Sequence, residues 1–184
     1  MFDGTCPWGA RVRAYRSRDV FTTVCSEPWQ VAGYWHLRTS IFVDEQRLFS
    51  RSDRDANDAR SLPIVSLSMQ GGMLDQVIGI VRVYPGEDAV WYGGRLGVCQ
   101  EYRRHGVVGE RLIKVAVGTA RALGCQRFLA TVQAPNVRYF ERHRFAVQRP
   151  IEVCGRPHAL MEARLADFEP VSLPAAFNSS GVAA

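Results

Sequence analysis

The sequence has no apolar run long enough to span a membrane. Residues 1–18 carry Asp3 and a spread of arginines where an export signal would need an unbroken apolar stretch, so we expect neither a membrane span nor an export signal. Cysteine is sparse as well. The five cysteines are odd in number, widely spaced and mostly embedded in apolar segments. This pattern argues against a disulfide framework, and we interpret the cysteines as core thiols of a cytoplasmic protein.

Lysine is almost absent, because Lys114 is the only one in the chain. Every other basic side chain is an arginine, and the net charge is +5. Arginine suits phosphate, because its planar fork donates two parallel hydrogen bonds. No basic run of five or more residues occurs, so nucleic-acid binding would rest on the net charge alone. A small polyanionic ligand is at least as well indicated.

The length of 184 residues, with 47% hydrophobic and 22% charged residues, is typical of one globular domain with its own core. We expect this domain to cover residues 1–169. The composition of residues 170–184 is that of a loop, which predicts a flexible or loosely docked tail.

Apolar periodicity predicts the order of the helices and strands. Helices are expected over residues 28–43, 106–123 and 136–143. Strands are expected over residues 20–25, 64–69, 77–84, 90–98, 128–132, 146–153 and 158–164. Ser26 is the expected cap of the first helix, and Gly124 should end the second. The predicted fold is α+β, with a central mixed, mostly antiparallel sheet of about six to seven strands flanked by helices.

The most informative segment is the polar loop that opens the helix predicted over residues 106–123. Unpaired backbone N–H groups and the positive end of the helix dipole would meet there, and Gly106 and Gly109 remove side chains that would block a ligand. Arg103 and Arg104 add positive charge. The loop therefore predicts an anion site, although it matches neither the dinucleotide fingerprint nor the P-loop. The alternative is a helix start whose glycines serve packing alone.

Residues 29–164 resemble the GNAT superfamily of acyl-CoA-dependent N-acyltransferases. The superfamily's pyrophosphate signature, Q/R-x-x-G-x-G/A, is similar to residues 103–108 (RRHGVV), with Val108 in the last place and Gly109 one residue later. Residues 95–98 resemble its splayed strand, and residues 133–145 its later strand-to-helix segment. The resemblance implies acetyl-CoA or another acyl-CoA as co-substrate, and it implies these binding residues: Leu96, Gly97, Val98, Arg103, Arg104, His105, Gly106, Val107, Val108, Gly109, Asn136 and Phe140.

A narrower resemblance links the chain to the GNAT members associated with nitrilase-containing biosynthetic gene clusters. The segments that carry it are Arg38 with residues 41–46, residues 52–55 with Asp58, and residues 91–98, 136–140 and 155–158. This resemblance does not imply a particular substrate.

Acyl transfer from a thioester needs a deprotonated amine, a polarised carbonyl and a stabilised thiolate. A backbone N–H near Val98 would polarise the carbonyl. In the superfamily a tyrosine on the last short helix commonly protonates the thiolate, but Phe140 stands at that place with Tyr139 beside it. One helical step turns a side chain by about 100°, so Tyr139 does not simply inherit the role. Tyr139 is either catalytic or a packing residue.

An acidic segment, residues 44–58, contains most of the side chains that could remove the proton from the amine. Residues 44–58 hold five acids and three arginines and so have a net charge of −2, which would form an acidic rim that attracts a cationic amine. The alternative is a solvated loop whose charges pair among themselves. The candidate bases are Glu45, Asp44, Asp53, Asp55, Asp58 and His36.

Glu45 is the favoured base because it follows the apolar run of residues 41–43. We expect it to be partly buried and paired with Arg38 or Arg95, in either a catalytic or a structural role. The residues expected to contact the acceptor are Arg38, Asp55, Asp58 and Arg95.

No metal site is expected, since the spacing of His105 and His158 with Cys99 or Cys154 does not match a zinc pattern. A Ser-His or Cys-His nucleophile is likewise not indicated. The sequence thus predicts a cytoplasmic N-acyltransferase that moves an acyl group, in the first instance acetyl, to a small-molecule amine by direct attack in a ternary complex. A non-catalytic acyl-CoA-binding module is the alternative, because Phe140 stands where the superfamily commonly has a proton-donating tyrosine. Neither nucleic acid nor membrane is an expected partner, and pairing of strand edges leaves a homodimer open.

Overall fold

A single sheet organises the chain. The computed structural model describes residues 19–173, and seven strands pair in it in the order β1-β2-β3-β4-β5-β7-β6. The strands are β1 (Val20–Val24), β2 (Leu62–Gln70), β3 (Met73–Pro85), β4 (Val90–Val98), β5 (Arg127–Gln133), β6 (Phe145–Val153) and β7 (Arg156–Ala163). Neighbouring strands are antiparallel, except that β4 and β5 are parallel. The predicted mixed, mostly antiparallel sheet is confirmed.

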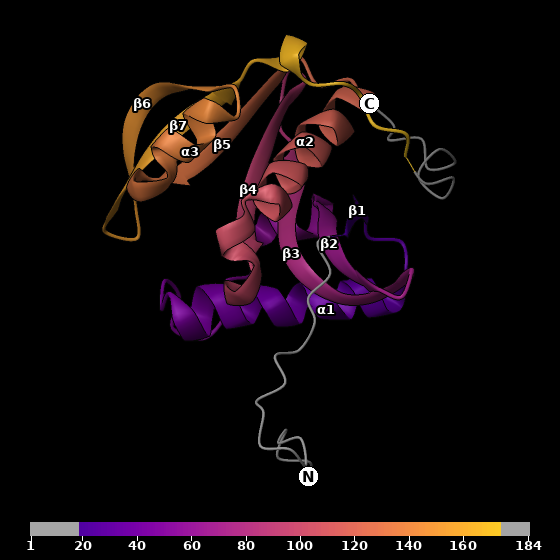
Figure 1. Cartoon of the computed structure of the whole chain (residues 1–184). Helices are drawn as coiled ribbons and strands as arrows, with labels where there is room; N and C mark the ends of the chain where they lie inside the picture. Colours follow the sequence, from indigo (N-terminus) through magenta and orange to yellow (C-terminus); the bar gives the residue numbers. More distant parts are fainter. Residues whose placement is uncertain (1–18, 174–184) are drawn as a thin grey trace.

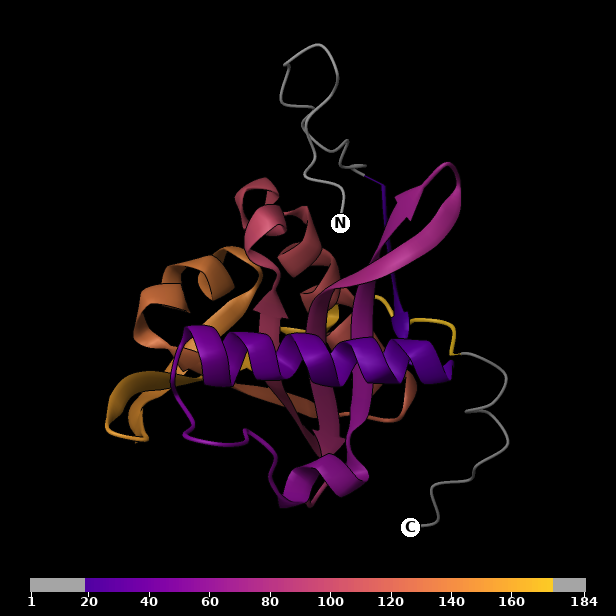
Figure 2. The same cartoon turned by 90° about the horizontal axis from the view of Figure 1, so that it is seen from below.

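Helices cover both faces of this sheet (Figure 1). The helices are α1 (Pro28–Thr39), α2 (Val107–Ala122) and α3 (Val137–Arg142). Figure 2 shows α1 lying across the strands on one face, whereas α2 and α3 pack on the other. Shorter turns complete the chain: η1 (Ser40–Glu45, π-helical) and the 3₁₀ turns η2 (Ala56–Arg60), η3 (Gln100–His105), η4 (Ala134–Asn136) and η5 (Leu165–Asp167).

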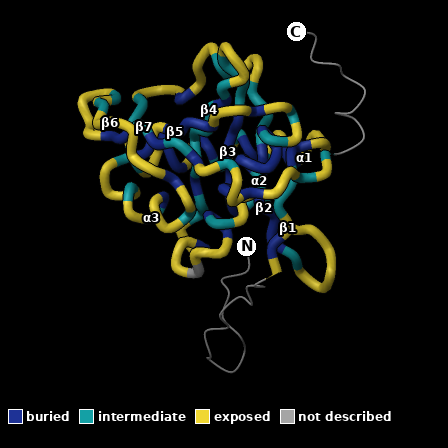
Figure 3. Tube along the Cα trace, turned by 90° about the horizontal axis from the view of Figure 1, so that it is seen from above, coloured by how far each residue is buried: buried dark blue, intermediate teal, exposed yellow. Residues whose placement is uncertain are grey.

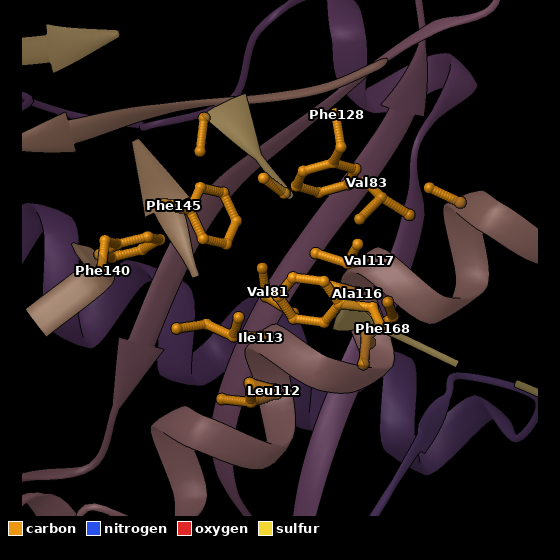
Figure 4. Close-up of a cluster of buried hydrophobic side chains, with 14 of the residues drawn as sticks. Val81, Val83, Leu112, Ile113, Ala116, Val117, Phe128, Phe140, Phe145 and Phe168 are labelled. Carbon is orange, nitrogen blue, oxygen red and sulfur yellow. The ribbon is translucent and has the colours of Figure 1, made fainter. Parts of the chain in front are cut away.

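Two hydrophobic clusters hold these layers together. Ile64 and Val65 are adjacent on β2, and both are fully buried: Ile64 belongs to the cluster on the α2 face and Val65 to the cluster on the α1 face. Successive strand side chains point to opposite faces, so both faces of β2 need apolar residues. Figure 3 shows the buried residues concentrated along the central strands. Figure 4 shows the α2-face cluster, in which Ile113 lies near Val81 and Phe140 near Phe145.

The start and the end of α1 differ from the prediction. Glu27, and not Ser26, is the N-cap. The side chain of Gln30 accepts hydrogen bonds from the N–H groups of Ser26 and Glu27, which completes a reciprocal capping box. At its other end the helix widens into η1, which still places Ile41 and Phe42 in the core.

The predicted tail begins as a packed segment. The Val171 N–H donates to the Gly118 carbonyl of α2 at 3.2 Å, and Leu173 packs against the core. The rest of the tail, residues 174–184, and the N-terminal residues 1–18 with Cys6 lie outside the described residues. Among the described helices none is long and apolar enough to cross a membrane.

The described cysteines only partly match the expectation of core thiols. Cys25 and Cys125 are buried and Cys99 is half-buried, but Cys154 is exposed beside the turn between β6 and β7. The core-thiol interpretation is therefore wrong for Cys154. All four are free thiols.

Candidate active site

A gap in the sheet forms the main cavity. The parallel strands β4 and β5 pair only over their first halves, from Val90 with Arg127 to Gly93 with Ala130. Beyond these pairs the strands separate, and side chains from both line a cavity of about 750 Å³. This volume lies in the range of small-molecule and cofactor sites. The splay that the sequence predicted for residues 95–98 is therefore present.

A bulge shapes the β4 side of the gap. On β3, one residue separates Ile80 from Arg82, but two residues separate their β4 partners Gly97 and Gly94. The extra residue on β4 leaves Arg95 with a φ of +56°, a left-handed conformation that is uncommon outside glycine. The bulge thus displaces β4 from regular pairing where the cavity begins.

A helix start forms another part of the cavity wall. Gly106 has a φ of +66° between η3 and α2, so it permits a backbone turn that other residues would strain to make. The first N–H groups of α2 have no preceding helical acceptor, since the Glu110 N–H is the one that bonds the Gly106 carbonyl. Gly106 and Gly109 both line the cavity. An anion in the cavity would meet these N–H groups and the positive helix end.

The departure from the signature at Val108 has a packing explanation. Val108 is buried, and a Cβ on Gly79 of β3 would lie 2.6 Å from its Cγ1. Gly79 therefore makes room for this valine. The glycine that follows serves a different contact, because a Cβ on Gly109 would lie 2.6 Å from the Tyr139 Oη. The anion loop keeps its open backbone despite the change.

Tyr139 and Phe140 both reach the cavity wall from α3, but in different surroundings. The Tyr139 hydroxyl donates to the Gly106 carbonyl at 3.3 Å, and burial raises the pKa of this tyrosine. Phe140 is buried with its ring edge-on to Phe145, at 5.2 Å between centroids. Tyr139 thus contacts the anion loop and could supply a proton there, while Phe140 has no group that could.

Glu45 is placed differently from the expectation. Its side chain is 43% exposed, and both its oxygens accept from Arg103 at 2.6 Å. The predictions that Glu45 is partly buried and pairs with Arg38 or Arg95 are therefore wrong. Hydrogen bonding from Arg103 lowers the pKa of Glu45, so this carboxylate is charged at neutral pH. Arg103 also donates from Nε to the Val98 carbonyl at 2.7 Å, which ties it to the end of β4.

Three arginines and three aspartates form an Asp–Arg cluster, which comprises Arg38, Arg82, Arg95, Asp53, Asp55 and Asp58. Asp53 and Arg38 are buried and approach to 2.5 Å. Burial opposes ionisation of Asp58, but hydrogen bonds from Arg38, the Asp55 backbone and Arg82 lower its pKa to about 2. Asp58 is therefore charged at neutral pH, and the cluster pairs three aspartates with three arginines.

The predicted acidic rim is consequently wrong. Asp53, Asp55 and Asp58 are neutralised by arginines from α1, β3 and β4, and not by the arginines of their own segment. Arg38 is completely buried behind the cluster, and neither Arg38 nor Asp58 lines the cavity, so their placement argues against direct contact with an acceptor. Asp55 and Arg95 do line it.

Arg82 was missed from the sequence, although a signal was present. It is the only charged residue in the second half of β3, where its neighbours Val81 and Val83 are buried. A buried arginine needs acidic partners, so this position predicts that carboxylates fold onto the strand.

His158 on β7 was considered from the sequence only as a metal ligand. Its ring is buried and lines the cavity, and its Nδ1 lies 2.9 Å from the Arg156 carbonyl oxygen. Because a carbonyl only accepts, Nδ1 carries the hydrogen, which leaves Nε2 as the ring nitrogen that could accept one. Nε2 bonds to no described residue and is not one of the buried unpartnered atoms, which are Arg82 Nε and Thr119 Oγ1. It is therefore open to the cavity.

The cavity gathers most of the predicted site residues. Those that line it are Leu96, Gly97, Val98, Arg103, Gly106, Gly109, Asn136, Tyr139, Phe140, Asp55 and Arg95. Those that do not are Glu45, Arg38, Asp58, Arg104, Val107 and Val108. The backbone of His105 ends η3, directly before Gly106. Among the described residues, no group of three or more His, Cys, Asp or Glu side chains could hold a metal ion.

Comparison with known proteins agrees with this architecture. The sequence profile of the acetyltransferase (GNAT) family matches residues 19–145, which is more than half of the chain. The chain belongs to the GNAT family. Members of this family use acyl-CoA as co-substrate. No curated protein sequence matches the chain significantly.

Solved GNAT structures show the same fold. A Lactobacillus plantarum protein described as an N-acetyltransferase has 24% identity and a TM-score of 0.68, covering 80% of this chain and 97% of its own. Escherichia coli ElaA has 19% identity and a TM-score of 0.64, covering 79% and 99%. An acyl-CoA N-acyltransferase from Pseudomonas aeruginosa has 19% identity and a TM-score of 0.63, covering 79% and 98%. At these identities the likeness shows the fold alone.

Proposed function

We propose that the protein transfers an acyl group from acyl-CoA to the amine of a small molecule by direct attack in a ternary complex. The observation that carries the proposal is one continuous cavity that joins the N-terminal end of α2 to a polar wall formed by β3 and β4. Its lining includes Gly106 and Gly109 at the helix start and Arg82 and Arg95 at the polar wall. A nucleotide cofactor and a second substrate would meet between the separated strands.

The residues present fit an acyl-CoA. The N–H groups at Gly106 and the first turn of α2 would hold the pyrophosphate, and Arg103 adds a guanidinium beside them. Gly97 and Val98 of β4 have no β5 partner. Because Arg103 already bonds the Val98 carbonyl, the Val98 N–H is the group that we propose for the pantetheine arm. Acyl-CoA supplies the acyl group and a thiolate leaving group.

In the reaction, the amine nitrogen forms a bond with the thioester carbonyl carbon, and the carbon–sulfur bond breaks. The products are an amide and CoA, so one proton must leave the nitrogen and one must reach the sulfur. We assign the first proton to Nε2 of His158, which faces the cavity as a free acceptor. Water would supply the second proton, and Tyr139, whose hydroxyl lies at the anion loop, stays a predicted catalytic residue.

Glu45 stays a predicted catalytic residue, and the two bases can be separated by mutation. His158→Gln should lower kcat/KM for the amine at least a hundredfold. Glu45→Gln should leave kcat/KM nearly unchanged, because Glu45 is exposed and bound to Arg103. His36→Gln is the matched control, since His36 is exposed on α1. The reverse pattern would assign the base to Glu45.

The finer assignments remain part of the proposal. Acetyl is the proposed acyl group, and a cytoplasmic location follows from the five widely spaced cysteines. The link to nitrilase-containing gene clusters, the homodimer and the domain boundary at residue 169 are predictions from the sequence.

The deciding experiment measures release of the free CoA thiol by the full chain with acetyl-CoA and a panel of amines. Mass spectrometry of each positive reaction should find the N-acetylated amine. Tight binding of acetyl-CoA without turnover of any amine would instead favour the non-catalytic acyl-CoA-binding module. Mass spectrometry of copurified ligands would test the acyl length directly.

A further inference from the structure

Arg95 is held rigidly at the cavity wall. Its Nε donates to Asp53 Oδ2 at 2.9 Å, and its Nη2 donates to the Asp53 carbonyl at 2.8 Å and to Asp55 Oδ2 at 3.2 Å. The guanidinium carbon lies 4.7 Å from the ring centroid of Phe49 and 5.9 Å from that of Phe42. With one edge bonded and its face against two rings, the guanidinium has little freedom to turn.

The remaining edge of this guanidinium has no partner. Arg95 Nη1 makes no hydrogen bond to any described residue and is not one of the buried unpartnered atoms. The Arg95 side chain is 19% exposed and lines the cavity, as do Phe42 and Phe49. Two N–H donors of a fixed cation are therefore open to the cavity.

The charge of the surrounding wall favours an anion at this place. Six of the lining residues form a surface that we call the acceptor wall: Phe42, Phe49, Asp55, Arg82, Tyr84 and Arg95. It contains two arginines and one carboxylate, because Asp53 and Asp58 lie behind it. Burial, with Arg82 and Arg38 nearby, lowers the pKa of Arg95, so an anion bound at its free edge would stabilise the charged guanidinium.

We propose that the acceptor is an amine that also carries a carboxylate, and that Arg95 binds this carboxylate through Nη1. The inference rests on the proposed acyl transfer and names its substrate class. A hydrogen bond from a guanidinium N–H to a carboxylate is charge-assisted, and it is therefore stronger than a bond to a neutral acceptor. The rings of Phe42, Phe49 and Tyr84 would then face the apolar part of the acceptor.

The test compares acceptors that differ only in the carboxylate. Phenylalanine and leucine are assayed with acetyl-CoA against phenylalaninamide and leucinamide, which keep the amine and the side chain. The wild-type protein should favour the free acids by roughly tenfold to a hundredfold in kcat/KM, as expected for a charged hydrogen bond. Equal or better use of the amides would overturn the proposal.

Substitutions of Arg95 test whether this side chain causes the preference for free acids over amides. Arg95→Gln should bring the acids and the amides within about threefold of each other while KM for acetyl-CoA stays unchanged. Arg95→Lys keeps a cation beside Asp53, so it guards against loss of folding and should retain only part of the preference. Arg54→Gln is the matched control, because Arg54 is exposed beside Asp53 and outside the cavity. A preference that survives in Arg95→Gln would also overturn the proposal.

A ligand-binding experiment tests this inference independently of the proposed reaction. If no amine is acetylated, the proposed function fails, and the subsite is still tested with N-acetylphenylalanine and its amide as probes. The acid alone should raise the melting temperature of the wild-type protein, and neither probe should raise that of Arg95→Gln. No stabilisation of the wild type by the acid would refute the subsite by itself.

Discussion

Replacing Gly106 tests the anion loop directly, and the chain contains a matched control. Gly106 and Gly124 stand at opposite ends of α2 with φ values of +66° and +88°, and a Cβ at either position would meet nothing within 4 Å. A valine at either position therefore costs about 1–2 kcal/mol of backbone strain and creates no steric clash. The two variants should lose similar stability in urea unfolding.

Their effects on CoA binding should differ. In Gly106→Val, relief of the strain turns the first N–H groups of α2 away from the phosphates, and loss of one charge-assisted hydrogen bond costs about 1.5–3 kcal/mol. This corresponds to a roughly tenfold to hundredfold weaker Kd, measured by calorimetry with CoA. Gly124→Val should bind CoA like the wild type. If Gly106→Val has the wild-type affinity while its stability falls like that of Gly124→Val, the loop does not bind the pyrophosphate.

Two further predictions concern charge. Arg103→Ala should weaken CoA binding by up to about 1.5 kcal/mol, and Arg104→Ala by less, because Arg103 is partly exposed and Arg104 lies outside the cavity. Calorimetry with CoA and with pantetheine checks this, since equal losses for both ligands would contradict a phosphate contact. The lowered pKa of Asp58, about 2 against 3.8, contributes roughly 2 kcal/mol of stability that is present above pH 3.8 and lost as the pH falls toward 2. Asp58→Asn should therefore be less stable at pH 7 in urea unfolding, and a difference that stays constant down to pH 2 would refute the assignment.

The fold could be predicted from the sequence because its signals are local. The strand predicted over residues 90–98 is β4 as observed, and the other strands differ by a few residues at their ends. The cap of α1 was predicted at Ser26 because serine is a preferred N-cap residue, but the reciprocal bonds between Glu27 and Gln30 place the cap at Glu27. No local pattern marked the widening of the helix into η1.

The site was only partly predictable because its charges pair across the chain. The glycines and arginines of residues 103–109 predict an anion loop from local sequence, and the structure places Gly106 and Gly109 at the cavity. The partner of Glu45, in contrast, is Arg103, which lies 58 positions away and comes close only after folding. Likewise Arg82 bonds Asp55 across 27 positions. Only the general rule that a buried arginine needs acids could have connected these segments.

Neutralisation of the acidic segment also changes the chemistry expected of the acceptor wall. An acidic rim would have stabilised the ammonium form of an amine and raised the amine pKa, which opposes nucleophilic attack. The observed wall presents Arg82 and Arg95 with Asp55 as its one carboxylate, so an amine placed beside it is favoured in its neutral form. In the proposed reaction, the remaining proton would then pass to Nε2 of His158. The buried Asp–Arg cluster orders the wall, and with its own acids paired it would leave a bound amine in the form that the proposed attack on a thioester requires.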